Sequence, residues 1–358
     1  MSIMKIGFLI VFSLIFSQNT QAQGCVAIKG TTSGCSRPAD ATGWELSINT
    51  RYFKSYKHFV GTKEQKERVE KKNNVINNAY ELNITVTRNL NSRISVAGTL
   101  PVLAFNRTSL YEHYQTERYK TGSFGIGDIR ISVYRWMMNP AKNLKGNIQL
   151  GLGIKLPTGN YNYQDYFYKK ADSAVFAPVD QSIQLGDGGT GVSFELNGYY
   201  NFNPKIGVYA NLFYLSNPRE VNGTSTARGG TPSVTAKKYN TDVMSVPDLF
   251  MARAGAAYTV KKITFSGGLR IEGLPSGDLI GGNRGFRRPG YIISAEPSVT
   301  YQSKTKKTSI ILAVPVALKR NRTQSDSDKR RTSDTGIHQQ GDAAFADYLI
   351  SAGVIFRL

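Results

Sequence analysis

The sequence predicts an all-β chain that crosses a membrane as a closed antiparallel barrel of about twelve strands. Three observations lead to this fold class. The N-terminus reads as a cleavable secretion signal, and the chain ends on an alternating apolar strand at Phe356, Arg357 and Leu358. Between them, segments long enough to cross a bilayer recur, joined by short and long connections in strict alternation.

The N-terminus has the parts of a signal peptide. Lys5 is followed by an apolar run at 6–16 and by small polar residues that end at Ala22. A run of about eleven apolar residues is shorter than the roughly 20 that a spanning helix needs, so we expect cleavage after Ala22. The predicted domains are a signal peptide at 1–22, a periplasmic segment at 23–43 and a transmembrane β-barrel at 44–358.

Cys25 and Cys35 are the two cysteines of the chain. They lie in an exported segment without a CxxC spacing or histidine partners, so we predict a small disulfide loop in place of a redox or metal site. An alternative makes Cys25 a lipid-modified N-terminus. The Leu that usually stands three residues before such a cysteine is missing here.

Period-2 alternation recurs along the chain and is cleanest at 192–202. Phe194 and Leu196 fall on one face there, while Ser193 and Glu195 fall on the other. Most such segments are about twice as long as the five or six residues of an average soluble strand. The predicted strands are 44–54, 78–89, 93–105, 123–136, 146–157, 189–202, 205–216, 248–260, 263–273, 289–302, 308–320 and 344–358.

The connections between these strands differ in length on the two sides of the predicted barrel. Short turns fall at 90–92, 137–145, 203–204, 261–262 and 303–307, and long polar loops fall at 55–77, 106–122, 158–188, 217–247, 274–288 and 321–343. This asymmetry is typical of barrels with both termini in the periplasm, short periplasmic turns and long extracellular loops. We therefore expect the outer membrane of a Gram-negative bacterium, reached through barrel-assembly machinery that reads the C-terminal strand.

The net charge of +20 limits the partners. In a cytoplasmic chain such a charge suggests nucleic acid, but an exported barrel meets outer-membrane lipid, lipopolysaccharide phosphates and anionic solutes instead. We expect no nucleic acid. We expect a monomer whose basic long loops either bind these anions or form a solvated surface.

Charged residues recur in the register that faces away from lipid, so the alternation assigns them to the lumen. If the turn near 141 is symmetric, Asp128 faces Lys155 and Arg130 faces Gly153. Arg253 is expected to face Arg270. The predicted lumen and solute-path residues are Asp128, Arg130, Lys155, Glu195, Arg253, Arg270, Glu272 and Glu296.

These charges have two compatible interpretations. They form a constriction or solute-binding strip, or they fill a narrow interior as ion pairs, with Glu272 and Glu296 as counterions of the arginines. Catalysis is not expected, and neither is a metal or cofactor. His58, His113 and His338 fall in predicted loops without a metal-binding spacing. A surface hydrolase would require His58 or His113 to meet carboxylates such as Glu112 and Glu117 in space.

Three short motifs carry a family resemblance. They are Phe-Gly-Ile-Gly-Asp at 124–128, Lys-Leu-Pro-Thr-Gly at 155–159 and Leu-Gly-Asp-Gly-Gly-Thr-Gly at 185–191. Together they resemble the outer-membrane barrels named for the meta-cleavage pathway of phenol degradation. The resemblance implies passive uptake of small organic compounds, often apolar or aromatic, without enzymatic activity. We thus expect facilitated transport of small solutes; the alternative is a closed barrel with a surface-binding or structural role through its basic loops.

Overall fold

The computed structural model describes residues 42–358, except 115–116 and 306. The described chain forms a closed antiparallel barrel of twelve strands, as the alternation and spacing predict. The predicted signal peptide and the predicted disulfide between Cys25 and Cys35 lie outside the described residues.

Nine barrel strands are continuous and three are interrupted. The continuous strands are β1 (Gly43–Ser55), β4 (Ile76–Asn89), β5 (Ile94–Ser109), β8 (Gly146–Lys155), β11 (Gly191–Asn201), β12 (Ile206–Ser216), β15 (Leu249–Val260), β16 (Ile263–Leu274) and β22 (Leu349–Arg357). The interrupted strands are β6 (Tyr119–Ile126) with β7 (Arg130–Trp136), β17 (Gly290–Ala295) with β18 (Ser298–Gln302), and β19 (Thr308–Ala313) with β20 (Val316–Arg322).

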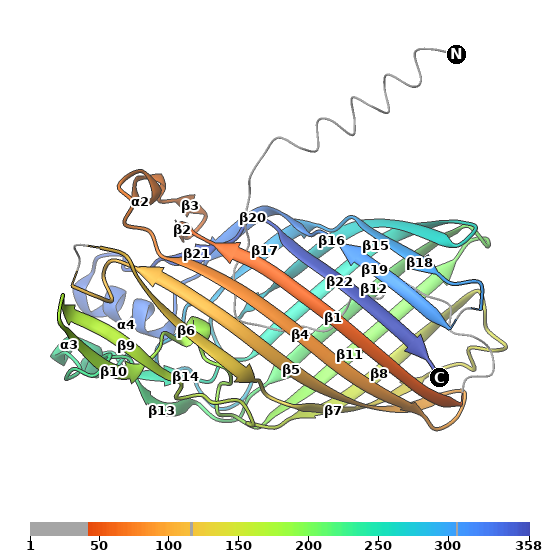
Figure 1. The fold of residues 1–358 in the computed structure, drawn as a ribbon, viewed down its shortest axis with the longest axis horizontal. Coiled ribbons are helices and arrows are strands. Elements are labelled where there is room, and N and C mark those ends of the chain that lie inside the picture. Colours follow the sequence, from red (N-terminus) through yellow and green to blue (C-terminus); the bar gives the residue numbers. More distant parts are fainter. Residues whose placement is uncertain (1–41, 115–116, 306) are drawn as a thin grey trace, which may run out of the picture.

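Neighbours in the chain are neighbours in the barrel, and the last strand closes the ring against the first. β1 pairs with β4 on one side and with β22 on the other, so Glu45 lies opposite both Thr87 and Arg357. Figure 1 shows the strands tilted across the barrel, with the chain's C-terminus at one end and most of the additional elements at the other. We call the end with the additional elements the long-loop end and the end with the C-terminus the short-turn end.

The interruptions correct the predicted strands at 123–136, 289–302 and 308–320. Two of them coincide with Pro297 and Pro315, which carry no N–H for the ladder. At the third, Gly127 donates its N–H to the carbonyl of Pro101, and residues 127–129 leave the strand. The last strand begins at Leu349, since β21 (Ala343–Phe345) pairs instead with β2 (Lys57–Val60).

The two faces of the wall differ in chemistry, as the alternation predicts. Large apolar side chains point outward and are exposed, among them Phe124, Leu152, Phe194, Leu212, Phe265, Leu269 and Leu312. Alternate residues point inward and are buried, and many of them are charged or polar. Transmembrane barrels have such an apolar outer band, which contacts lipid, around a polar interior, which contacts water.

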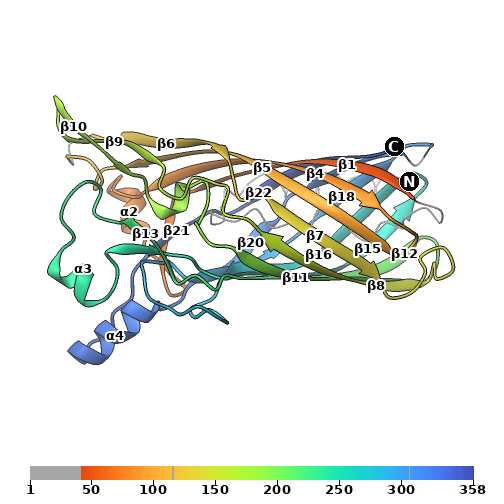
Figure 2. The same cartoon turned by 90° about the horizontal axis from the view of Figure 1, so that it is seen from below.

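Small elements cover the long-loop end. They are β2, β3 (Lys63–Glu64), α2 (Lys66–Glu70), β9 (Gln164–Lys170), β10 (Ser173–Pro178), the 3-10 helix η2 (Gln181–Ile183), β13 (Val221–Ser225), α3 (Val234–Lys238), β14 (Val243–Ser245), α4 (Asp326–Thr335) and β21. Figure 2 shows α3 and α4 standing at this end, away from the wall. None of the helices in the described part of the chain is long and apolar enough to span a membrane.

The connection from β8 to β11 folds into the barrel. Val179, Ile183 and Leu185 are almost completely buried. They pack in one apolar cluster with Phe53 of β1 and Ile292 of β17, which belong to different parts of the wall. We call residues 179–189 the inward loop; it narrows the lumen at the long-loop end.

Candidate functional site

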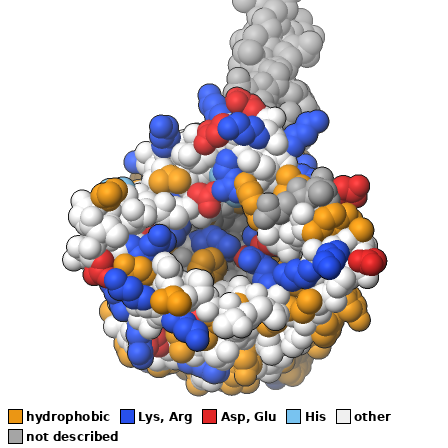
Figure 3. All heavy atoms as spheres, turned by 90° about the vertical axis from the view of Figure 1, so that its left-hand side faces the viewer, with side chains coloured by type: hydrophobic (Ala, Val, Ile, Leu, Met, Phe, Trp, Pro, Cys, Tyr) orange, Lys and Arg blue, Asp and Glu red, His pale blue; other side chains and the backbone are white. Residues whose placement is uncertain are grey.

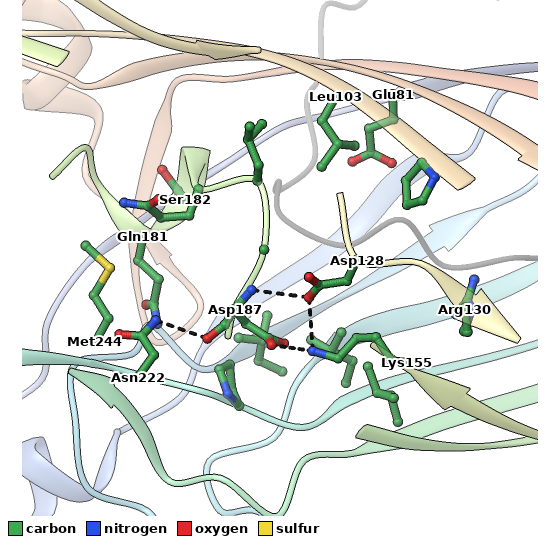
Figure 4. A pocket seen from close by; sticks show the side chains of 18 of the residues that line it. Glu81, Leu103, Asp128, Arg130, Lys155, Gln181, Ser182, Asp187, Asn222 and Met244 are labelled. Atoms are coloured by element: carbon green, nitrogen blue, oxygen red, sulfur yellow. Dashed lines mark hydrogen bonds and ion pairs between the residues drawn. The ribbon is translucent and has the colours of Figure 1, made fainter. Parts of the chain in front are cut away.

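A compact ionic cluster anchors the inward loop to the wall. The ammonium of Lys155, the last residue of β8, lies 3.2 Å from the Asp128 carboxylate and also pairs with Asp187 of the inward loop. Asp128 in turn accepts hydrogen bonds from the backbone N–H of Gly159 at 2.9 Å and of Asp187 at 3.3 Å. We call Asp128, Lys155 and Asp187 the anchor cluster; Figure 4 shows them joined.

All three sequence motifs of the family resemblance meet at this anchor cluster. Thr158 adds a second connection, because its hydroxyl donates to the Gly127 carbonyl and accepts from the Ile129 N–H, both at 2.9 Å. The glycines are required by the close approach of the segments. A Cβ on Gly186 would lie 2.6 Å from an Asp128 carboxylate oxygen and from the Gly159 carbonyl. The three motifs thus supply the residues that let the inward loop pack closely against the wall.

The strand register around Arg130 differs from the predicted pairing of Asp128 with Lys155 and of Arg130 with Gly153. Arg130, not Asp128, lies opposite Lys155, and Gly153 lies opposite Ser132. The turn at 137–145 is not symmetric about 141, since Trp136 pairs with Gln149. Asp128 lies outside the ladder in the break between β6 and β7, and its side chain still reaches Lys155.

Asp180 ties the other end of the inward loop to the barrel. Its carboxylate accepts bidentate hydrogen bonds from Arg288 at 2.9 and 2.8 Å, and it lies 3.3 Å from Arg228 and 3.4 Å from Arg107. Burial opposes ionisation, but Arg107, Arg288 and Arg228 outweigh it and hold the pKa of Asp180 well below its usual value. Asp180 is therefore a carboxylate at neutral pH.

Glu112 shares the same arginines and completes this group. It accepts from Arg107 at 2.8 Å and from Arg228 at 2.6 Å. Burial would raise the pKa of Glu112, yet the charges of Arg107 and Arg228 lower it overall. We call Arg107, Glu112, Asp180, Arg228 and Arg288 the loop-end network. It links β5, the inward loop and three other long loops, which contain Glu112, Arg228 and Arg288.

The predicted arginine ladder lies within the lumen and connects distant parts of the wall. Arg253 pairs with Arg270 across the β15–β16 hairpin, in the register that the short turn predicts. Glu296 lies 2.7 Å from Arg253 and 3.1 Å from Arg270. Glu272 lies 2.7 Å from Arg270 and 3.1 Å from Arg51, a residue of β1.

Glu81 of β4 extends this group, with its carboxylate 3.9 Å from Arg51. We call Arg51, Glu81, Arg253, Arg270, Glu272 and Glu296 the charge belt. Glu195 lies outside the belt, where it accepts a 2.9 Å hydrogen bond from the Tyr134 hydroxyl. The belt fills part of the interior with paired charges, one of the two arrangements expected from the sequence.

A cavity of about 190 Å³ lies inside the barrel beside the inward loop. The anchor cluster, Arg130, Glu81 and Arg288 supply charges to its lining. Gln181, Ser182 and Asn222 supply neutral polar groups (Figure 4). Much of the remaining wall is apolar, from Pro101, Leu103, Phe105, Leu185, Phe213, Leu215, Met244, Pro247, Leu249 and Leu274. The cavity therefore has a polar side and a broad apolar side.

Three of the eight predicted path residues line this cavity: Asp128, Arg130 and Lys155. The sequence-based reasoning missed the apolar lining and the inward loop. A signal for the lining is present, since Leu103 and Phe105 of β5 and Phe213 and Leu215 of β12 are large apolar residues in the inward register. The inward loop gave no comparable signal, because polar loops of this kind also project into solvent.

The histidines have structural partners. His58 Nδ1 lies 2.7 Å from Asp342, and its Nε2 accepts the Val75 N–H at 2.9 Å. His113 Nδ1 accepts the Tyr168 N–H at 3.1 Å. Burial lowers the pKa of His58. Within the described residues, no group of three or more His, Cys, Asp and Glu side chains is arranged to hold a metal ion.

Basic residues surround the opening at the long-loop end. Figure 3 shows Lys and Arg side chains around a hollow on this face. Exposed lysines and arginines of this end include Lys63, Lys66, Lys71, Lys72, Lys120, Lys169, Lys170, Lys237, Arg284 and Arg331. Basic side chains thus surround the opening where a solute or a surface partner would arrive.

No protein-family model matches the chain, and no curated protein matches it. The toluene transporter TodX of Pseudomonas putida is 10% identical, with a TM-score of 0.43, over 94% of this chain and 96% of that one. An outer membrane channel from Pseudomonas putida F1 is 11% identical, with a TM-score of 0.57, over 92% of this chain and all of that one. The second likeness, across the whole barrel, shows that the chain shares the fold of that outer membrane channel.

Proposed function

We propose that this protein is an outer-membrane barrel through which small organic solutes, apolar and aromatic compounds among them, diffuse passively. The observation that carries the proposal is the lumenal cavity with its broad apolar side, held open between the wall and the anchored inward loop. Ligand sites are usually concave and mostly apolar with a few placed polar groups. The shared fold with an outer membrane channel supports the same function.

The size of the cavity favours small solutes. An apolar cavity of about 150 Å³ in another protein is large enough for benzene. The cavity here, about 190 Å³, accommodates one substituted aromatic ring or a short aliphatic chain. Larger solutes require the inward loop to move, and charged solutes without an apolar part gain nothing from the apolar side.

The proposal includes the cellular placement. We infer the outer membrane of a Gram-negative bacterium, with both termini and the short-turn end in the periplasm. The exposed apolar band suits lipid, and the basic rim of the long-loop end suits lipopolysaccharide phosphates. A signal peptide at 1–22, a disulfide in the 23–43 segment, assembly through the C-terminal strand and a monomeric barrel complete this proposal.

The experiment that tests transport combines single-channel conductance in planar bilayers with solute uptake by liposomes. The refolded chain without residues 1–22 is compared with protein-free membranes and with Arg253→Ala. Transport predicts uptake above the protein-free rate and channel openings that Arg253→Ala alters. Uptake at the protein-free rate, from a barrel whose circular dichroism and heat-dependent gel mobility show correct folding, would contradict it.

A second candidate function is a closed barrel with a surface role. The observation that favours it is the filled lumen: the charge belt joins β1 to β16, the loop-end network joins β5 to the inward loop, and a modest cavity is left between them. In that case the basic rim binds anionic glycan or lipopolysaccharide. Binding of lipopolysaccharide together with absent solute uptake, in the assays above, would favour this candidate.

A further inference from the structure

Arg130 differs from the other charged side chains that line the lumenal cavity. Six charged residues line it: Glu81, Asp128, Arg130, Lys155, Asp187 and Arg288. Five of them have an oppositely charged partner within 4 Å. Among residues 42–358, leaving aside 115–116 and 306, no hydrogen bond or ion pair reaches the Arg130 guanidinium. It lies over the ring of Phe213, 5.1 Å from the ring centroid, and its neighbours across the ladder are Thr99 and Lys155.

The lack of an ionic partner is unusual for a side chain in the position of Arg130. The residue is more than nine-tenths buried, at 8% exposure, yet its side chain faces the cavity. A guanidinium carries five N–H donors in a fixed fork. No Arg130 nitrogen is among the fully buried side-chain atoms without a hydrogen bond, so these donors are open to the cavity. Phe213 covers one face of the group, and its donating edge is left for an occupant of the cavity. Figure 4 shows Arg130 apart from the joined anchor cluster.

We propose that the cavity binds small monocarboxylates with an apolar body, such as aromatic or short aliphatic acids, and that Arg130 holds their carboxylate. This inference rests on the proposed transport function and names the solute class. The apolar side, with Leu103, Phe105 and Met244, takes the hydrocarbon part. The guanidinium takes the carboxylate through paired N–H donors.

The other charges of the lining favour a singly charged anion. Asp128, Asp187 and Glu81 already have cationic partners and would repel a second negative charge on the solute. A phosphate or a dicarboxylate would bring that second charge near the anchor cluster. A cation finds no carboxylate in the lining without a partner. One guanidinium beside an apolar wall thus matches one carboxylate on an apolar body.

The test measures binding of benzoate and of benzamide, its uncharged analogue of similar shape, to the folded full-length mature chain by equilibrium dialysis at pH 7. Benzoate is expected to bind roughly 10- to 100-fold more tightly than benzamide, the usual range for charge-assisted hydrogen bonds. Arg130→Met should remove this preference, and Arg130→Lys should retain part of it. Arg135→Met is the matched control, because Arg135 lies on the exposed outer face of the same strand.

Two results would overturn the inference: equal affinity for benzoate and benzamide in the wild type, or an unchanged benzoate preference in folded Arg130→Met. Liposome uptake separates this from a failure of the transport proposal. If benzamide enters through the protein but benzoate has no advantage, transport stands and the role of Arg130 is wrong. If neither solute enters faster than through protein-free membrane, the transport proposal fails.

Discussion

Lys155 is the cation on which the anchor cluster depends. It is buried, and it separates two carboxylates, Asp128 and Asp187, that would otherwise repel each other. A buried ion pair adds little net stability over an apolar pair, but removal of one partner leaves a charge without compensation. The local function of Lys155 is therefore to make the close approach of wall and inward loop possible.

Lys155→Met is expected to lower the free energy of unfolding by roughly 3 to 5 kcal/mol, the usual cost of removing one partner of a buried pair. The measurement is urea-induced unfolding of the barrel in lipid vesicles, followed by tryptophan fluorescence. Lys205→Met is the control, since Lys205 lies exposed in a short turn. An equal decrease in the free energy of unfolding for the two variants would show that the anchor cluster does not stabilise the barrel.

Residue-level pairing could be predicted only where the turn was short. The two-residue connection at 261–262 fixed Arg253 opposite Arg270, because a tight hairpin permits one register. The connection at 137–145 permits several registers, and the prediction that Asp128 faces Lys155 across the ladder was wrong. The break at 127–129, which frees Asp128 for the anchor cluster, has no signal in the alternation.

The inward loop is the element that distinguishes this barrel from an open pore. Its two ends are fixed by different chemistry: the anchor cluster holds Asp187, and the loop-end network holds Asp180. Between them the Ile183 carbonyl accepts a hydrogen bond from the Ser123 hydroxyl, which fixes the loop against β6. Any opening wide enough for a large solute must break at least one of these attachments.

Gly186→Ala tests the close approach that this element requires. The added Cβ would lie 2.6 Å from Asp128 and Gly159, so the inward loop must shift. We expect faster hydrogen exchange of the Ile183 and Leu185 amides and larger channel openings. Gly267→Ala, whose Cβ would have no atom within 4 Å, is the matched control. Unchanged exchange in Gly186→Ala would mean that the junction is not tightly packed.

The strands themselves were predictable because lipid and lumen impose alternation on each strand of a closed barrel. The sequence-based prediction did not include the breaks in three of these strands, and the reason is physical. Pro297 and Pro315 interrupt hydrogen bonding without changing the alternation of the flanking residues, so the pattern continues across them. The inward position of residues 179–189 depends on ionic partners from distant loops, which a local pattern does not contain.

The loop-end network gives the whole molecule a defined response to acid. Asp180 and Glu112 have pKa values below those of the unfolded chain, so their contribution to stability is present above the unfolded values, near pH 4 to 4.5. It is lost as the pH falls through the folded values. We expect channel behaviour to stay constant from pH 7 to about pH 5, with more frequent openings below about pH 4.

Single-channel recording over this pH range checks the prediction, with Asp180→Asn as the comparison. The substitution removes the charge that holds Arg288 and Arg107, so this variant should show frequent openings already at neutral pH. Openings that increase above pH 5 in the wild type would assign the acid response to other groups.

At the scale of the whole molecule, an apolar outer band surrounds a lumen that the charge belt and the inward loop narrow, and the proposed solute path runs through this lumen past the inward loop. The measurement that tests this most directly is liposome uptake of a neutral aromatic solute, benzamide, by the wild type and by Asp180→Asn. The account predicts uptake above the protein-free rate, and faster uptake by Asp180→Asn. Uptake at the protein-free rate by both proteins, each correctly folded, would contradict it.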